Sequence, residues 1–550
     1  MKLHQFLGFI FLLGFSLLSA QSETPTPKNW PQLDLTKDGF PGMSTDKAYA
    51  ELLAGKGGQT VIVAIIDSGV DAEHEDLADI MWVNKNEIPG NGIDDDQNGY
   101  IDDIHGWNFI GGKDGQNINA ENLEIIRMYR QYKTRFDGVD VAKLSKSARK
   151  DYNQFKEYEK TIEEKRSSLE PNALLYGRTL EMMDDLVEAI GKKPGNIKQA
   201  DVEKHVEDAG NVGKAAQFMN GILDKGEDFA DVYGQVKGAA DYFGESYNFN
   251  WNPEYDARAI VGDDPANLND RNYGNNDVEG PDARHGTHVA GIVAAIRGNG
   301  IGMDGVASNV RIMSVRAVPN GDERDKDVAN AIRYAVDNGA TVINMSFGKG
   351  ESPYKAAVDD AVRYARSKDV LLVHAAGNDG KENQFDNNYP NDKFAKKGFL
   401  KPKYADNWIE IGAMGPANDE NLTADFSNWS ADKVDVFAPG VEIYSTVPNN
   451  EYEDLQGTSM AAPMVAGLAA LLRSYFPDLT AEQVKQIIMD SSVKPQQMVN
   501  VPGEDGKATL SKLSVSGGIA NTFRAVEMAI QTKGAKKKAP ARDPGLTPKA

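Results

Sequence analysis

The sequence predicts an α/β protein with a doubly wound, mainly parallel sheet covered by helices on both faces, together with an inserted α-helical subdomain. Short apolar stretches alternate with helical patterns along much of the chain, and this alternation is typical of a parallel sheet. One long stretch, residues 112–250, instead has apolar residues at helical spacing among many Lys and Glu residues and predicts helices alone.

The first predicted strand covers residues 61–66, which form a continuous apolar run, as expected of a strand buried on both faces. It leads directly into Asp67. A carboxylate at the carboxyl end of a parallel strand faces the crevice where open α/β sheets bind ligands. Further strands are predicted over residues 311–315, 341–345, 370–374, 409–413 and 434–437.

Four helices are predicted between or after these strands, over residues 327–337, 354–367, 459–475 and 481–491. The last has Thr480 as its N-cap and Gln483 in the capping-box position. At the start of the third, Ser459 lies beside helix N-terminal amides, where a developing negative charge is stabilised. Such a serine is a candidate nucleophile, and a plain N-cap is the alternative.

The predicted helical insertion contains two clear amphipathic stretches. Its apolar residues at helical spacing are Tyr152, Phe155, Tyr158, Ile162, Leu180, Met183, Val187 and Ile190. Gly and Asn residues at 191–196 and 210–213 are expected to interrupt the helices. We expect a bundle or coiled hairpin packed on the rest of the protein.

Both ends of the chain differ from the rest. Residues 1–20 have the pattern of a signal peptide, with Lys2, an apolar core over residues 6–18 and small residues before Gln21. That core is too short to span a bilayer, and no later stretch is apolar enough for a membrane span. We therefore expect a secreted or periplasmic protein. The Lys/Pro-rich residues 534–550 predict a disordered tail.

The composition argues against one class of partner and excludes cysteine chemistry. The net charge of −22, from 82 acidic and 60 basic residues, argues against nucleic acid as a partner. The chain has no cysteine, which excludes disulfides, thiol catalysis and a lipidated N-terminal cysteine.

Three polar motifs occur in the order Asp, His, Ser. They are Asp67-Ser68-Gly69, His285-Gly286-Thr287-His288-Val289-Ala290-Gly291 and Gly457-Thr458-Ser459-Met460-Ala461-Ala462-Pro463. This is the subtilisin order of the Ser-His-Asp triad. Through these motifs and Ala375-Ala376-Gly377-Asn378, the chain resembles the subtilisin-like serine proteases (subtilases). The resemblance covers about residues 42–109 and 255–530.

The resemblance implies a subtilisin-like fold and a secreted serine endopeptidase acting on peptides or proteins. It implies Ser459 as nucleophile, His285 as general base, Asp67 as the group that orients the imidazole, and Asn378 as an oxyanion donor. The implied substrate-binding residues are Ser346, Phe347, Gly348, Ala376 and Gly377. A catalytically inactive peptide-binding protein that retains the fold is the alternative.

Other histidines have simpler interpretations. His285 and His288 could together hold a metal, but the HExxH pattern of zinc proteases is absent. We expect His288 to be a packed helix residue and His374 to end a strand.

An acidic loop follows the first strand. Residues 94–102 match the first nine positions of an EF-hand-type calcium loop, but the twelfth position is His105 rather than glutamate. Asp103 is a possible replacement, and an Asx-rich turn without an ion is the alternative. The expected calcium ligands are Asp94, Asp96, Asn98, Tyr100 and Asp102.

These observations predict an ordered set of segments. After the signal peptide come an N-terminal segment (21–42), the first part of the catalytic domain (43–111), the helical insertion (112–250), the second catalytic part (251–533) and the tail (534–550). Subtilases often carry a folded propeptide, but only 22 residues separate Ala20 from Met43, so the sequence leaves maturation unexplained. The insertion contains none of the four catalytic residues, and we hypothesise that it gates the cleft, with a purely structural role as the alternative.

Overall fold

A computed structural model describes residues 26–384, 388–395 and 402–535. The expected signal peptide lies outside the described residues, as do residues 536–550 of the expected tail. Within the described ranges, no helix is both long enough and apolar enough to cross a membrane.

The centre of the protein is a seven-stranded sheet whose neighbouring strands all pair in parallel. The strand order is β2-β3-β1-β4-β5-β6-β7. The strands are β1 (Val61–Asp67), β2 (Gly106–Asn108), β3 (Val310–Arg316), β4 (Val342–Met345), β5 (Leu371–Ala375), β6 (Trp408–Met414) and β7 (Val436–Pro439). The strand order reverses at β1, because β3 lies on one side of it and β4 on the other. This is the position where open α/β sheets form their ligand crevice.

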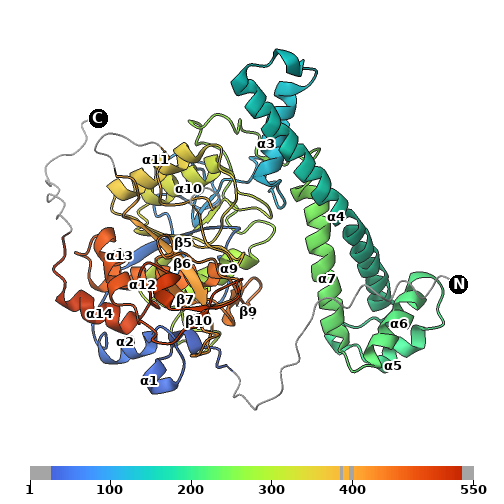
Figure 1. Ribbon diagram of the computed structural model, residues 1–550. Helices are drawn as coiled ribbons and strands as arrows, with labels where there is room; N and C mark the ends of the chain where they lie inside the picture. Colours follow the sequence, from blue (N-terminus) through green and yellow to red (C-terminus); the bar gives the residue numbers. More distant parts are fainter. Residues whose placement is uncertain (1–25, 385–387, 396–401, 536–550) are drawn as a thin grey trace.

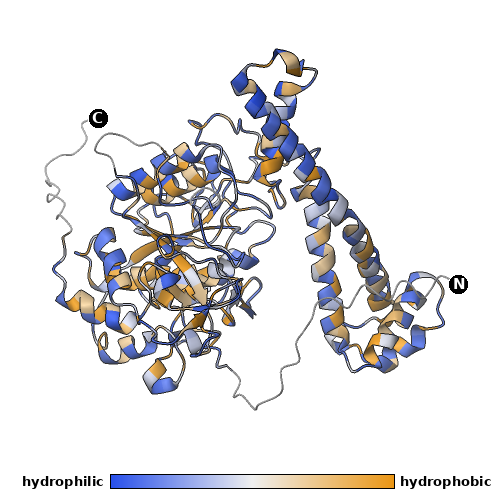
Figure 2. Cartoon of the chain, in the orientation of Figure 1, coloured by the Kyte–Doolittle hydropathy of each residue, from blue (hydrophilic) through white to orange (hydrophobic). Residues whose placement is uncertain are grey.

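Helices cover both faces of the sheet, which confirms the predicted fold class. One hydrophobic core joins alternate β1 residues such as Val63 and Ile65 to the helices α9 and α12. The other joins Ala64 and Ile66 to α10 and α11. These helices are α9 (Arg284–Ala294), α10 (Asp325–Asp337), α11 (Lys355–Ser367) and α12 (Thr458–Tyr475). Figure 2 shows the hydrophobic residues gathered on the central strands between these layers.

Shorter elements complete the sheet-containing part. Thr480 and Gln483 form the predicted capping box at the start of α13. The elements are η1 (Trp30–Gln32), α1 (Leu35–Asp38), α2 (Thr45–Glu51), η2 (Ala78–Ile80), α8 (Arg258–Val261), β8 (Ile443–Val447), β9 (Glu451–Leu455), α13 (Ala481–Asp490), β10 (Val499–Asn500), β11 (Lys507–Ala508), η7 (Leu510–Lys512) and α14 (Thr522–Gln531).

Between β2 and α8 the chain forms mainly helices, drawn in Figure 1 as an arm that leaves the sheet-containing part. The helices are α3 (Glu124–Phe136), η3 (Val141–Lys143), α4 (Lys146–Ile190), η4 (Pro194–Asn196), α5 (Gln199–Val202), η5 (Glu203–His205), α6 (Gly210–Leu223), α7 (Phe229–Glu245) and η6 (Ser246–Asn250). Helix α4 is 45 residues long; Ser145 caps its start, and Gly191 ends it in the left-handed conformation.

The arm has two small cores of its own. Near its root, Phe155, Tyr158 and Ile162 of α4 pack against Ile126 and Tyr129 of α3. At its far end, α4, α6 and α7 share a separate core that includes Met183, Met219 and Phe229. Both sets of predicted amphipathic positions therefore face helix partners.

Candidate active site

Asp67 and His285 meet at the carboxyl edge of the sheet. Asp67 ends β1, and His285 is the second residue of α9. Nδ1 of His285 lies 2.7 Å from Oδ1 of Asp67, which also accepts a hydrogen bond from the Ser68 amide. The Asp67 side chain is almost fully buried, whereas the His285 side chain is 39% exposed. The carboxylate therefore holds one side of the imidazole while the other side remains accessible.

The residues around His285 explain how α9 approaches the strand end so closely. Gly286 packs against the backbone of Gly69, and a Cβ at this position would collide with the Gly69 carbonyl. The next residue, Thr287, accepts a hydrogen bond at Oγ1 from the Asp71 amide at 2.9 Å. Gly286 and the Thr287 hydroxyl thus hold the start of α9 against the loop after β1.

Two opposing effects act on the pKa of His285. Burial opposes the charged form, but the adjacent Asp67 carboxylate outweighs it and raises the pKa of His285 above 6.5. Histidine, whose ordinary pKa is about 6.5, suits proton transfer at physiological pH.

Ser459 lies in the first turn of α12. The helix is capped by Gly457, whose φ of 153° is in the range that favours glycine. The Ser459 hydroxyl donates a hydrogen bond to the Ser346 carbonyl at 3.2 Å. Among the residues that the structure describes, no hydrogen bond joins the Ser459 hydroxyl to His285. Catalytic hydrogen bonds are often loose in the absence of substrate.

Asn378 is held so that its amide nitrogen is left to donate. Its Oδ1 accepts hydrogen bonds from the amide (2.8 Å) and the hydroxyl (2.9 Å) of Thr458. An ideal Cβ placed on Gly457 would lie 3.4 Å from Asn378 Nδ2 and 3.5 Å from the Ser459 amide nitrogen. Two hydrogen-bond donors therefore border the same space beside Gly457, as an oxyanion site requires.

Two chain segments flank this space. The first follows β4: Ser346 is buried, Phe347 half-buried and Gly348 exposed. The Ser346 hydroxyl donates to the Ser459 carbonyl at 2.9 Å, which fixes the segment to α12. The second follows β5: the Gly377 amide donates to Thr458 Oγ1 at 3.1 Å.

Sequence reasoning missed two parts of this arrangement. Thr458 fixes the second segment to α12 through its hydroxyl, which binds Asn378 and Gly377. Asn428 supports the second segment by donating to the Ala376 carbonyl at 3.0 Å. Thr458 lies within a recognised motif and was an available signal, whereas Asn428 has no local pattern that marks it.

The remaining candidate histidines are packed inside the protein. His288 is fully buried in α9 and lies 3.2 Å from the Glu453 carbonyl; burial lowers its pKa to about 3. His374, near the end of strand β5, forms a buried pair with Glu410 at 3.0 Å. Both sites match the expected packed helix residue and strand end.

The acidic loop divides into two sets of residues. Asp94 accepts hydrogen bonds from the Asn98 and Gly99 amides, and Asp102 accepts them from Asn91 and Gly92. These are the contacts of an Asx-rich turn. A different trio, Glu87, Asp96 and Asp103, has carboxylate oxygens within 4.8 Å of one another. Of the five predicted ligands, only Asp96 belongs to that trio.

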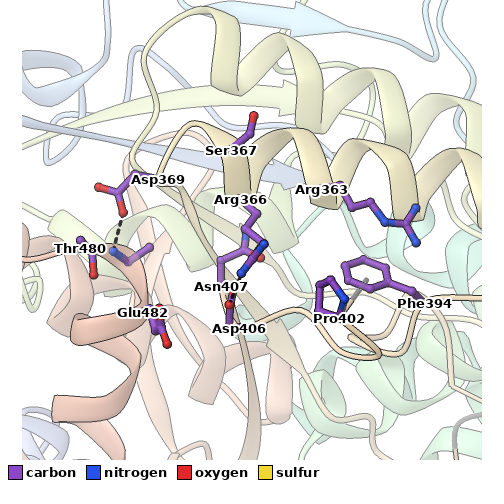
Figure 3. Close-up of a pocket in the computed structure, with 11 residues that line it drawn as sticks. Arg363, Arg366, Ser367, Asp369, Phe394, Pro402, Asp406, Asn407, Thr480 and Glu482 are labelled. Atoms are coloured by element: carbon purple, nitrogen blue, oxygen red, sulfur yellow. Dashed lines mark hydrogen bonds and ion pairs between the residues drawn. The ribbon is translucent and has the colours of Figure 1, made fainter. Parts of the chain in front are cut away.

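A pocket of about 390 Å³ lies elsewhere (Figure 3). Its lining includes Arg366, where α11 ends, Asp406 before β6, and Glu482 in α13. Arg366 and Asp406 form an ion pair there. None of the predicted catalytic or substrate-binding residues lines this pocket.

A doubly wound sheet with an Asp-His pair at its carboxyl edge and a serine at a nearby helix start defines a class of α/β protein suited to nucleophilic hydrolysis. The model of the Subtilase family (Peptidase_S8) matches residues 58–519. The chain belongs to this family.

Individual relatives cover less of the molecule. The chain is 41% identical over 224 residues to a thermophilic serine proteinase of Bacillus sp. (strain AK1), covering 40% of this chain and 49% of the relative. It is 42% identical over 206 residues to subtilisin DY of Bacillus licheniformis, covering 36% and 67%. For thermitase of Thermoactinomyces vulgaris, 42% identity over 191 residues covers 34% and 61%. The chain thus spans about half to two thirds of the length of these curated relatives.

Proposed function

We propose that this chain is a secreted serine endopeptidase that hydrolyses peptide bonds through an acyl-enzyme. The observation that carries the proposal is the 2.7 Å contact between His285 Nδ1 and the buried Asp67 carboxylate, with Nε2 left to serve Ser459. Membership of the subtilase family and the identity to serine proteinases support the same reaction.

In the proposed first half-reaction, Ser459 Oγ attacks the scissile carbonyl carbon and passes its proton to His285 Nε2. Asp67 stabilises the resulting imidazolium and stays ionised. The carbonyl oxygen becomes an oxyanion that accepts hydrogen bonds from Asn378 Nδ2 and the Ser459 amide. The C–N bond then breaks, and His285 returns the proton to the leaving amine.

In the second half-reaction, His285 takes a proton from water while the water oxygen attacks the acyl-enzyme ester. The ester C–O bond to Ser459 breaks, the proton returns to Ser459, and the acid product leaves. The reaction requires the Ser459 hydroxyl to turn from the Ser346 carbonyl toward His285.

The proposed substrate is an extended peptide. Backbone groups of Ser346, Phe347 and Gly348 on one side, and of Ala376 and Gly377 on the other, would pair with it as an added strand. The exposed Gly348 leaves its backbone accessible to such a partner. Half-buried Phe347 favours an apolar substrate side chain.

Calcium is proposed as a structural ion of the acidic loop. Carboxylate oxygens are ligands that Ca²⁺ prefers, and the Glu87, Asp96 and Asp103 trio provides them. Asn84 Nδ2 donates to both Asp96 and Asp103. A shared donor brings the two carboxylates close together, as a bound cation would. Glu87 and Asp96 also accept hydrogen bonds from amides of the loop, so the closeness of the three carboxylates to one another is what favours the trio.

The test of the proposed activity uses a serine-directed fluorophosphonate and casein as substrate. The parent protein should become labelled and should hydrolyse casein, and both properties should disappear in Ser459→Ala. His285→Ala should abolish turnover as completely, because the two residues act as a unit. A folded parent protein that neither reacts with the phosphonate nor cleaves casein is instead the catalytically inactive peptide-binding protein.

A further inference from the structure

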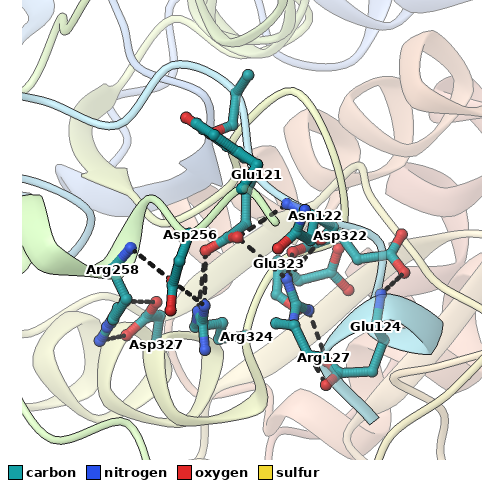
Figure 4. Close-up of polar contacts among 12 residues, drawn as sticks. Glu121, Asn122, Glu124, Arg127, Asp256, Arg258, Asp322, Glu323, Arg324 and Asp327 are labelled. Atoms are coloured by element: carbon teal, nitrogen blue, oxygen red, sulfur yellow. Dashed lines mark hydrogen bonds and ion pairs between the residues drawn. The ribbon is translucent and has the colours of Figure 1, made fainter. Parts of the chain in front are cut away.

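The root of the helical arm is tied to the sheet-containing part by buried ion pairs (Figure 4). Glu121, just before α3, binds Arg324 through Nη2 at 2.9 Å. Glu124, the first residue of α3, binds Arg127 Nη2 at 2.6 Å. Arg127 in turn donates to the Asp322 carbonyl at 2.9 Å.

Lys349 brings this network to the proposed substrate-binding segment. It directly follows Ser346, Phe347 and Gly348, and its side chain is only 1% exposed. Its Nζ lies 2.7 Å from the Glu124 carboxylate and 3.0 Å from Asp325. An ammonium buried to this degree is stable only with such partners. The insertion therefore supplies part of the charge that keeps Lys349 in place.

The substrate-binding segment is consequently fixed at both ends. At one end, the Ser346 hydroxyl binds the Ser459 carbonyl in α12. At the other end, the Lys349 backbone pairs with Tyr389 at 2.8 and 3.0 Å, while its side chain reaches α3. Phe347 and Gly348 lie between the two anchors. Small shifts of either anchor change the backbone positions that an extended peptide must match, and such misplacement is costly in catalysis.

We propose that Glu124 is a positioning residue for the substrate-binding segment, acting through Lys349. The root of the insertion is then part of the peptide-binding machinery even though it touches no reacting atom. This proposal rests on the proposed endopeptidase function and on the role of the segment from Ser346 to Gly348. It concerns binding of the extended peptide and leaves the Asp67, His285 and Ser459 chemistry unchanged.

The main test compares Glu124→Gln with the parent on two substrates. For an apolar tetrapeptide p-nitroanilide, which needs the substrate-binding segment, kcat/KM should fall about tenfold or more, chiefly through KM. For p-nitrophenyl acetate, which needs only the triad and the oxyanion donors, the rate per active site should stay within about twofold. Active sites are counted with the fluorophosphonate, so a loss of folded enzyme does not imitate the effect.

The matched control is Glu159→Gln, which removes a half-buried partner of the exposed Lys156 on α4 and should change neither rate. Unchanged tetrapeptide kinetics in folded Glu124→Gln would overturn the proposal, as would equal losses on both substrates. Failure of the proposed function is a separate outcome, because the parent protein itself would then show no labelling and no ester hydrolysis.

A double-mutant cycle tests whether Glu124 acts through Lys349. It combines Glu124→Gln with Lys349→Met, which removes both members of the pair. We expect the tetrapeptide loss in this double variant to be smaller than the product of the two single losses, because the residues act through one contact. Independent losses that simply multiply would overturn the proposal.

Discussion

The Asp67 carboxylate is the main group that raises the pKa of His285, with a smaller contribution from Asp282. The Asp67 side chain is buried and lies 2.7 Å from Nδ1, so the carboxylate stabilises the imidazolium on its inner side. The raised pKa of His285 is the direct consequence, and it makes the protonation of this residue the natural control of activity at low pH.

Asp67→Asn tests that control. In the parent, the acid limb of kcat/KM should have its midpoint above pH 6.5, because the free enzyme is active only with His285 neutral. Removing the carboxylate lowers the pKa of His285, so the midpoint should move to lower pH. The rate should also fall by about 10⁴-fold, since the imidazole loses its orienting partner. A pH profile of tetrapeptide hydrolysis measures both effects, and a midpoint that does not move contradicts the assignment.

Glu323 is a second residue whose charge matters, here for stability. Burial raises its pKa from 4.5 to about 7, although Lys349 opposes the change. The native state therefore retains a proton between pH 4.5 and 7 that the unfolded chain has released. Stability contributed in this way is present below pH 4.5, falls as the pH rises through this window, and is lost above pH 7.

Glu323→Gln removes this titration and keeps the shape of the side chain. At pH 8 the variant should have a higher free energy of unfolding than the parent, by up to about 3 kcal/mol from the size of the pKa shift. At pH 5 the gain should be much smaller. Urea unfolding at the two pH values measures the difference, with the exposed Glu254→Gln as control. An equal gain at both pH values would show that Glu323 does not titrate in this window.

Much of the candidate site is visible in the sequence at the residue level, because Asp67, His285, Asn378 and Ser459 each stand in a short motif. The supporting contacts are not visible there. Glu124 and Lys349 are 225 positions apart, and neither has neighbours that distinguish it from an ordinary surface charge. Their pairing depends on tertiary structure, which no local pattern encodes.

Two helices, α9 and α12, position His285 and Ser459, because both helices begin at the carboxyl edge of the sheet. Helix α9 reaches the end of β1 only because Gly286 has no side chain to collide with Gly69. The two helices also pack against each other in the same core. The relative positions of His285 and Ser459 are therefore set by helix packing rather than by flexible loops.

Gly286→Ala tests this close approach. The added methyl group has no space, so we expect α9 to shift, the free energy of unfolding to fall by about 1–3 kcal/mol, and kcat to fall at least tenfold. Gly221→Ala is the matched control, because Gly221 lies in α6 with open space around its Cβ position. Thermal melts and ester hydrolysis measure the effects. Parent-like activity in Gly286→Ala would contradict the packing argument.

The acidic loop gives a second prediction at this scale. If Glu87, Asp96 and Asp103 hold calcium, EDTA should lower Tm and added calcium should restore it, because an ion bound only by the native state stabilises that state. Asp96→Ala should remove the response. Asp94→Ala distinguishes the trio from the EF-hand-like ligand set, since it should keep the response only if the trio binds the ion. A Tm indifferent to EDTA and calcium would contradict both sets.

Sequence patterns predicted most elements closely, because buried parallel strands and amphipathic helices have strong periodicities. They missed β2, which is only three residues long and has Trp107 as its one large apolar residue. They also suggested an interruption at 210–213, whereas Gly210 begins α6. The length of α4 was not foreseen either, since Pro171 lies inside it and proline normally ends or kinks a helix.

At the scale of the whole molecule, the arm consists of two parts with different relations to the catalytic core. The far part, with α5, α6 and the adjoining ends of α4 and α7, has its own hydrophobic core. The root, with α3, contributes Glu121 and Glu124 to buried ion pairs with Arg324 and Lys349. Removing the far part exposes little of the sheet-containing core, whereas removing the root takes one carboxylate partner from the buried Lys349 and one from the half-buried Arg324.

Two deletions of different length separate these roles. The shorter one removes residues 177–242 and joins Tyr176 to Phe243 through a short Gly/Ser linker, because their stacked rings lie 5.5 Å apart. It should hydrolyse p-nitrophenyl acetate within about tenfold of the parent, or ~1.4 kcal/mol. The longer one replaces residues 113–248 and removes Glu124. It should yield much less phosphonate-reactive enzyme and lose tetrapeptide hydrolysis.

The ratio of casein to ester hydrolysis in the shorter variant then tests the gating hypothesis. If the far part of the arm restricts access of bulky substrates, this ratio should rise while ester hydrolysis stays near the parent value. An unchanged ratio in a well-folded variant assigns the far part a purely structural role. Equal activity of the shorter and longer deletions would contradict the importance of the root, because the buried Lys349 would then tolerate the loss of Glu124.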